Sequence, residues 1–190
     1  YPVQKGHILL ITNEWKEQNG WIDNKDWEAI KEVNEDTTGL WFFNSGPLAG
    51  ASQPHRHIQL LRRDPSELSC PRERWILDFD NENYKNQRFY KNIILKKFSK
   101  TLNKENIHEI YKVLSYKLGL GKPEIDKKPR YPYNLIFTNH WMLLIKRKTD
   151  NLYGISVNAL GFAGYILVTE KSDINYLKKI GPEKLLENFL

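Results

Sequence analysis

Cysteine is nearly absent from this sequence of 190 residues, since Cys70 is the only one. A single cysteine cannot form an internal disulfide, and there is no Cys-x-x-Cys pair. These absences exclude a disulfide-rich secreted scaffold and a cysteine-based zinc site. The sequence also shows no secretory leader. The expected compartment is therefore the cytoplasm.

Long apolar runs and blocks of like charge are missing as well. No run approaches the ~18 apolar residues that a membrane-spanning helix needs. The formal net charge is +6, but Lys and Arg are scattered and occur only in short clusters such as Lys146-Arg147-Lys148. We therefore expect an ordinary solvated basic surface, with neither a nucleic acid nor a membrane as partner.

Apolar and aromatic residues are plentiful: 40% of the chain is hydrophobic, with six Trp, ten Tyr and eight Phe. This content favours a single domain over residues 1–190, within which we expect a first half at about 1–62 and a second half at about 130–190. The aromatic residues are spread along the chain, so we expect them in the core rather than on a base-stacking surface. Because the chain starts without Met and close to a strand-like run, we also expect that an N-terminal segment is lacking.

Hydrophobic periodicity predicts an α+β fold, with an antiparallel sheet and flanking helices. Residues 62–100 are predicted to be an irregular connection with some helix. Strands are predicted at 7–12, 39–43, 55–61, 133–137, 141–146, 154–158 and 165–169. Helices are predicted after a cap at Asn24 or Asp26, over 107–118 with Gly119 as the end, from Ser172 to Gly181, and from Pro182 onward.

Two short patterns suggest an internal repeat. Residues 6–11 resemble 139–145 with one extra residue. Residues 44–50 and 158–164 both read Asn-x4-Ala-Gly. Two pseudo-repeats and a chance match both remain open.

The candidate site combines a strand with the loop before it. His55, His57 and Gln59 alternate along the predicted strand, so their side chains share one face. In the loop at 44–54, glycines and other small residues would let the amides of residues 50–53 approach an anion closely. A phosphate held there would lie within reach of the histidines, and neutral imidazole is a competent nucleophile toward phosphorus.

Other chemistries fit these residues less well. The His-x-His pair alone is also compatible with a metal site or a polar patch, but a zinc site would need further ligands that the pattern does not supply. A serine hydrolase is disfavoured because Ser45 and Ser52 lie in no nucleophile-elbow context.

The run NSGPLAGASQPHRHIQLL, residues 44–61, closely resembles the signature of the ATP adenylyltransferases, also called diadenosine tetraphosphate phosphorylases, of the histidine triad superfamily. Residues 133–147 and 154–164 are similar to the C-terminal half of that family. The resemblance implies a histidine triad-like fold. It also implies reversible phosphorolysis of diadenosine tetraphosphate to ATP and ADP through an adenylylated histidine.

The resemblance also implies roles for individual residues. His57 would be the nucleophile, His55 would position it, and Gln59 would bind a phosphate oxygen. Further substrate contacts would come from Asn44, Gly50, Ala51, Ser52, Gln53, Asn158, Ala159 and Leu160. The expected partners are small nucleotides and phosphate. No tightly bound cofactor or protein-held metal is expected, although a divalent cation such as Mg²⁺ can accompany the polyphosphate.

Three alternatives stay open at this point. One is a hexose-1-phosphate uridylyltransferase, although Pro normally separates the two histidines of that family and Arg56 separates them here. Another is a dinucleoside polyphosphate hydrolase. The third is a nucleotide-binding sensor that lacks turnover.

Overall fold

The computed structural model describes residues 6–64, 66–79 and 88–190. Its centre is a six-stranded sheet in the order β1-β3-β2-β5-β6-β4, and every neighbouring pair is antiparallel. The strands are β1 His7–Ile11, β2 Gly39–Asn44, β3 His57–Arg62, β4 Ile93–Lys97, β5 Tyr133–Phe137 and β6 Trp141–Lys146. A small hairpin, β7 Asn151–Leu152 and β8 Ile155–Ser156, lies apart from this sheet.

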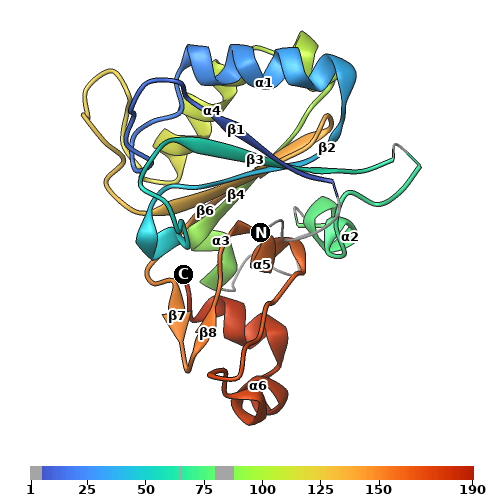
Figure 1. Cartoon of the computed structure of the whole chain (residues 1–190), viewed down its shortest axis with the longest axis vertical. Helices are drawn as coiled ribbons and strands as arrows, with labels where there is room; N and C mark the ends of the chain where they lie inside the picture. Colours follow the sequence, from blue (N-terminus) through green and yellow to red (C-terminus); the bar gives the residue numbers. More distant parts are fainter. Residues whose placement is uncertain (1–5, 65, 80–87) are drawn as a thin grey trace.

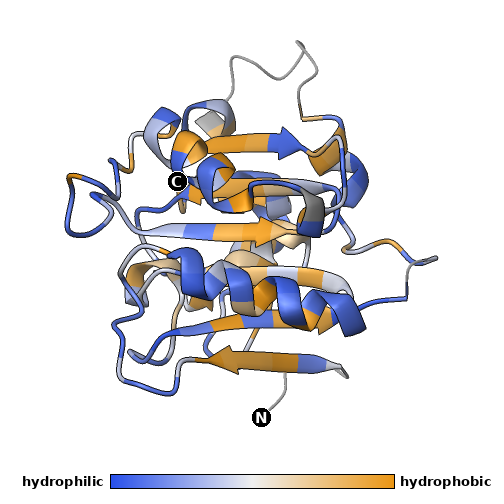
Figure 2. Cartoon of the chain, turned by 90° about the horizontal axis from the view of Figure 1, so that it is seen from above, coloured by the Kyte–Doolittle hydropathy of each residue, from blue (hydrophilic) through white to orange (hydrophobic). Residues whose placement is uncertain are grey.

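Helices pack on both faces of the sheet (Figure 1). One face is covered by α1 Asn24–Asp36 and α4 Ile107–Lys117, and the other by α2 Glu73–Leu77, α3 Arg88–Asn92, α5 Ala159–Ala163 and α6 Ile174–Glu187. The described residues also contain two short 3₁₀ turns, η1 Pro47–Ala49 and η3 Leu102–Lys104. Figure 2 shows largely hydrophobic strands beneath a helix of mixed polarity, as expected for a sheet with a core on each face.

The predicted α+β class and most of the predicted elements are confirmed. Gly119 follows the end of α4 with a φ of 78°, as a helix-terminating glycine does. Gly181 breaks α6 with φ 78° and ψ 162°, so two helical segments meet there as expected. The caps differ, however, because Asp23 rather than Asn24 or Asp26 caps α1, and Asp173 rather than Ser172 caps α6.

Two strand predictions are wrong, and one strand was not predicted. Residues 165–169 form no strand, because they cross the surface after α5 and no strand of the described residues pairs with them. The strand expected at 154–158 shrinks to β8, since Asn158 already caps α5. Within the connection expected at 62–100, β4 was missed, being a short edge strand that ends in two lysines.

The internal repeat appears in the topology. The orders β1-α1-β2-β3 and β4-α4-β5-β6 match. In each half the first strand lies at the edge of the sheet, the second lies at its centre, and the third lies between these two. The expected pairing of segments was wrong, because β1 corresponds to β4 and not to β6. The second half of the sheet therefore begins at Ile93, well before residue 130.

Candidate active site

His57 opens strand β3, and its side chain lies on the face opposite α1 and α4. Ile58 and Leu60 enter the core beneath those two helices, so His57 and Gln59 face the other way, as the alternation predicts. His55 precedes β3, so it lies outside the strand predicted at 55–61, and its backbone forms an isolated antiparallel bridge with Glu17.

A hydrogen bond fixes the tautomer of His57. Its Nδ1 lies 2.8 Å from the backbone oxygen of His55, and a carbonyl oxygen can only accept. Nδ1 therefore carries the proton, and the neutral ring presents the Nε2 lone pair. Within the described ranges no residue forms a hydrogen bond with Nε2. This atom is also not one of the fully buried side-chain atoms that lack a hydrogen-bond partner. This nitrogen can attack an electrophile such as phosphorus.

Gln18 holds the backbone on either side of the loop, a role the sequence did not reveal. Its Oε1 accepts from the amide of His57 at 2.8 Å, while its Nε2 donates to the backbone oxygens of Asn44 at 2.8 Å and His57 at 3.1 Å. The side chain is buried. Gln18 thus joins the end of β2 to the start of β3.

Gln59 has a partner that the sequence also left unassigned. Its Oε1 lies 3.0 Å from Nε2 of His7, whose ring stacks on Phe42. Because the amide oxygen accepts this bond, His7 donates it, and the NH₂ group of Gln59 remains a donor. Gln59 can therefore offer N–H bonds to a phosphate oxygen beside His57.

Asn44 ties the loop to the second half of the chain. Its Oδ1 accepts from the amide of Ala159 at 2.9 Å and from Asn134 Nδ2 at 2.8 Å. Ala159 and Leu160 are themselves buried. The structure thus places Asn44, Ala159 and Leu160 as supports behind the loop.

Gly50 lies against Asn158, which caps α5. Gly50 has a φ of 85°, and a Cβ there would stand 2.6 Å from the Asn158 Cβ. Side chains rarely adopt this conformation, and the contact leaves no room for one. The glycine is therefore explained by packing, without an anion.

Two of the four predicted cradle amides already have acceptors. The amide of Gly50 donates to Pro47 at 2.7 Å, and that of Ala51 donates to Gly46 at 2.9 Å. Among the residues that the structure describes, nothing accepts from the amides of Ser52 and Gln53. These two amides are the ones left to bind an anion.

Arg147 was expected on the basic surface, and this was wrong. The side chain is buried behind the site, where its Nη2 donates to the backbone oxygens of Val157 at 2.7 Å and Thr149 at 2.6 Å, and its Nη1 donates to Asn134 Oδ1. Burial lowers the pKa of the guanidinium to about 9. Arg147 supports the Asn44–Asn134 pair from below.

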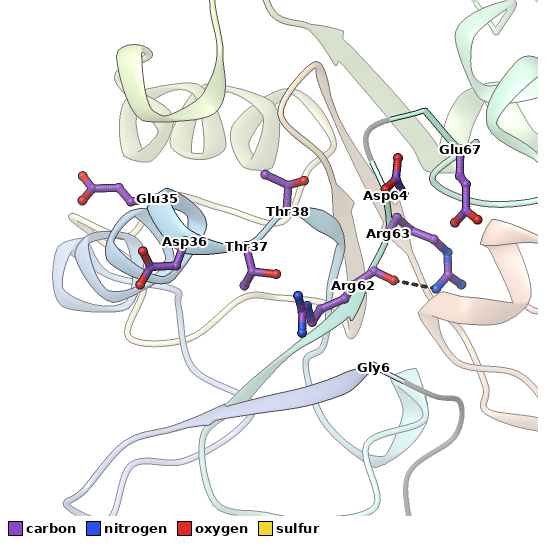
Figure 3. Close-up of a pocket in the computed structure, with 9 residues that line it drawn as sticks. All are labelled: Gly6, Glu35, Asp36, Thr37, Thr38, Arg62, Arg63, Asp64 and Glu67. Atoms are coloured by element: carbon purple, nitrogen blue, oxygen red, sulfur yellow. Dashed lines mark hydrogen bonds between the residues drawn. The ribbon is translucent and has the colours of Figure 1, made fainter.

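A hollow of about 610 Å³ lies at the far end of β3 and does not include His57 (Figure 3). The side chains of Arg62 and Arg63 point apart there. Acidic and basic side chains both line this hollow, so it is no dedicated anion site. Its lining residues are Gly6, Glu35, Asp36, Thr37, Thr38, Arg62, Arg63, Asp64 and Glu67. Two smaller hollows, of about 310 and 360 Å³, border the loop on either side, one at residues 51–54 and the other at Gly50 and Asn158.

In residues 6–64, 66–79 and 88–190 no group of three or more His, Cys, Asp or Glu side chains could hold a metal ion. No helix in that part of the chain is long and apolar enough to cross a membrane.

Fold and site together define an α+β protein in which a His-x-His-x-Gln strand follows a loop of small residues. Residues 82–189 match the family model described as ATP adenylyltransferase C-terminal domain, and residues 1–76 match Ap4A phosphorylase N-terminal domain. The chain belongs to the ATP adenylyltransferase family. One sheet joins both matched regions, since the first supplies β1 to β3 and the second β4 to β6.

Curated relatives and solved structures agree with this placement. Protein APA1 of Saccharomyces cerevisiae is 24% identical over 212 residues, covering 100% of this chain and 65% of the relative. Diadenosine 5',5'''-P1,P4-tetraphosphate phosphorylase 2 of the same yeast is 23% identical, covering 93% and 62%. The crystal structure of yeast Ap4A phosphorylase Apa2 has the same fold, with a TM-score of 0.64 at 18% identity over 97% of this chain and 66% of that one. The chain thus spans less than two thirds of these relatives.

Proposed function

We propose that this chain forms the catalytic part of a nucleotidyltransferase that converts diadenosine tetraphosphate and phosphate to ATP and ADP. The observation that carries the proposal is the bond from His57 Nδ1 to the His55 carbonyl, which leaves Nε2 as a nucleophile. A relative named as a diadenosine tetraphosphate phosphorylase, and an Apa2 structure in complex with Ap4A at a TM-score of 0.61, support this substrate.

The reaction would take two steps. In the first, His57 Nε2 attacks an α-phosphorus, a P–N bond forms, and the P–O bond to the departing ATP breaks. The Gln59 NH₂ and the amides of Ser52 and Gln53 would hold the phosphate oxygens. In the second step, an oxygen of inorganic phosphate attacks the same phosphorus, the P–N bond breaks, and ADP leaves with His57 regenerated.

Gln59 favours transfer to phosphate over hydrolysis. A histidine at this position could supply a proton near neutral pH, but an amide is a fixed donor and acceptor. The adenylylated enzyme should therefore wait for a charged acceptor, and water should compete poorly. ATP and ADP would be the nucleotide ligands of the enzyme.

The proposed location is the cytoplasm, since the chain has a single cysteine, Cys70, and this cysteine is free.

Product analysis with and without phosphate tests this function. The protein is incubated with diadenosine tetraphosphate, and mass spectrometry without acid treatment detects any nucleotide that is covalently bound to it. Phosphate should accelerate consumption and yield ADP with ATP, with an adenylyl adduct on His57. Release of AMP at a rate indifferent to phosphate would instead make the protein a hydrolase. Nucleotide binding without an adduct or turnover would make it a sensor.

A further inference from the structure

Trp15 departs from the expectation that the aromatic residues lie in the core. Its side chain is 66% exposed, whereas Trp27, Trp41 and Trp141 are buried. Its ring stacks on His55, with centroids 5.1 Å apart and an angle of 30° between planes. An exposed indole that stacks on a histidine of the candidate site offers an aromatic face to a ligand bound there.

Hydrogen bonds hold the His55 ring, on which this indole stacks, before any ligand binds. His55 Nε2 lies 3.1 Å from both Thr12 Oγ1 and the backbone oxygen of Glu14, which fixes the ring beneath Trp15. The next residue, Arg56, anchors the backbone here. It forms a buried ion pair with Asp26 at 2.9 Å and donates to the Glu17 backbone oxygen at 2.8 Å. A ring ordered in advance loses little conformational entropy when a ligand stacks on it.

Trp15 lines the hollow of about 310 Å³ that borders the loop at residues 44–54. Gly46 and Pro47 form another part of its wall, and Ser52 and Gln53, with their unpaired amides, form a third. The volume is at the lower end of the range for small-molecule sites. The site therefore combines an aromatic surface with donors suited to a phosphate chain.

We propose that this hollow binds the nucleobase of the nucleotide that leaves as ATP, stacked on Trp15. The proposal rests on the proposed function and specifies where the second half of the dinucleotide lies. Along β3, Gln59 and His7 lie to one side of His57, while His55, Trp15 and the unpaired amides lie to the other. The transferred nucleotide occupies the Gln59 side, and the departing phosphates run past Ser52 and Gln53 toward the indole.

Two partial reactions separate the two halves of the substrate. Exchange of labelled phosphate into ADP needs only the transferred nucleotide, whereas cleavage of diadenosine tetraphosphate and its synthesis from ATP need both. Trp15→Ala should raise the KM for diadenosine tetraphosphate, and for ATP as acceptor, roughly tenfold. It should leave the KM for ADP in the exchange reaction within twofold. Trp15→Phe should restore most of the loss.

Tyr116→Ala, which removes an aromatic ring of similar exposure from α4, is the matched control and should change neither reaction. An equal rise of both KM values in Trp15→Ala, or no rise in either, would overturn the subsite. Fluorescence gives a test independent of turnover, because ATP should quench the emission of the wild-type protein and not that of Trp15→Phe. Equal quenching in both proteins overturns the subsite, whereas absent phosphate exchange in the wild type counts against the proposed function alone.

Discussion

The two halves of the sheet repeat one order of elements but differ on the middle strand. In the first half, the face of β3 opposite α1 carries His57 and Gln59, and the adjacent β1 leaves Leu9 and Ile11 about half exposed. In the second half, the same face of β6 carries Trp141, Leu143 and Ile145, all fully buried with α5 and α6 in one core. We call this face of the first half open because β1 is half exposed there, although His57 and Gln59 themselves are only 8% and 9% exposed. The proposed chemistry thus falls in the half whose face is partly uncovered, and the half whose face is covered by helices contributes stability.

The largest effect should come from removing the proposed nucleophile on the open face. His57→Ala is expected to lower turnover of diadenosine tetraphosphate by about 10,000-fold or more, because the proposed mechanism forms its covalent intermediate on this imidazole. ATP binding by calorimetry and the midpoint of urea unfolding should change little. Substantial residual turnover would remove His57 from the mechanism and with it the contrast between β3 and β6.

The covered face should respond in the opposite way. Leu143→Ala, in the middle of β6, is expected to lower the free energy of unfolding by about 2–5 kcal/mol through lost burial and a residual cavity. Gln59→Ala, on the same face of β3, should lower it by less than about 1 kcal/mol while reducing turnover, since its hydrogen bond joins a partly buried pair. Urea titration of both variants checks the contrast, and similar losses of stability would refute it.

Substitution of Gln18 should have an intermediate effect on turnover. This side chain holds the backbones of Asn44 and His57 in the first half of the sheet and is not proposed to contact the reacting atoms. Gln18→Met keeps the volume but removes all three hydrogen bonds to Asn44 and His57, which should cost about 1–3 kcal/mol of stability. Displacement of His57 should also lower kcat by roughly tenfold with a smaller change in KM. Gln18→Glu, which keeps only the acceptor, should not rescue kcat. An unchanged kcat in Gln18→Met would limit Gln18 to a structural role.

Local patterns predicted those parts of the site in which neighbours in sequence are neighbours in space. Alternation along one strand placed His57 and Gln59 on one face, and helical periodicity placed α1 and α4. The missed partners come from far along the chain, since Gln18 and His7 lie 39 and 52 positions from the residues they hold. Strand propensity failed at 165–169 for a related reason, because a ladder needs a neighbouring strand that composition does not report.

The smallest effect should come from His55, the other histidine of the motif. The group that fixes the tautomer of His57 is the backbone carbonyl of His55, which every substitution at this position retains. His55→Ala should therefore preserve the Nδ1 proton of His57, visible in the ¹⁵N chemical shifts of its imidazole. The loss of the ring beneath Trp15 should lower turnover only several-fold. A fall as large as that of His57→Ala, with the tautomer unchanged, would mean that the His55 side chain itself acts on the substrate.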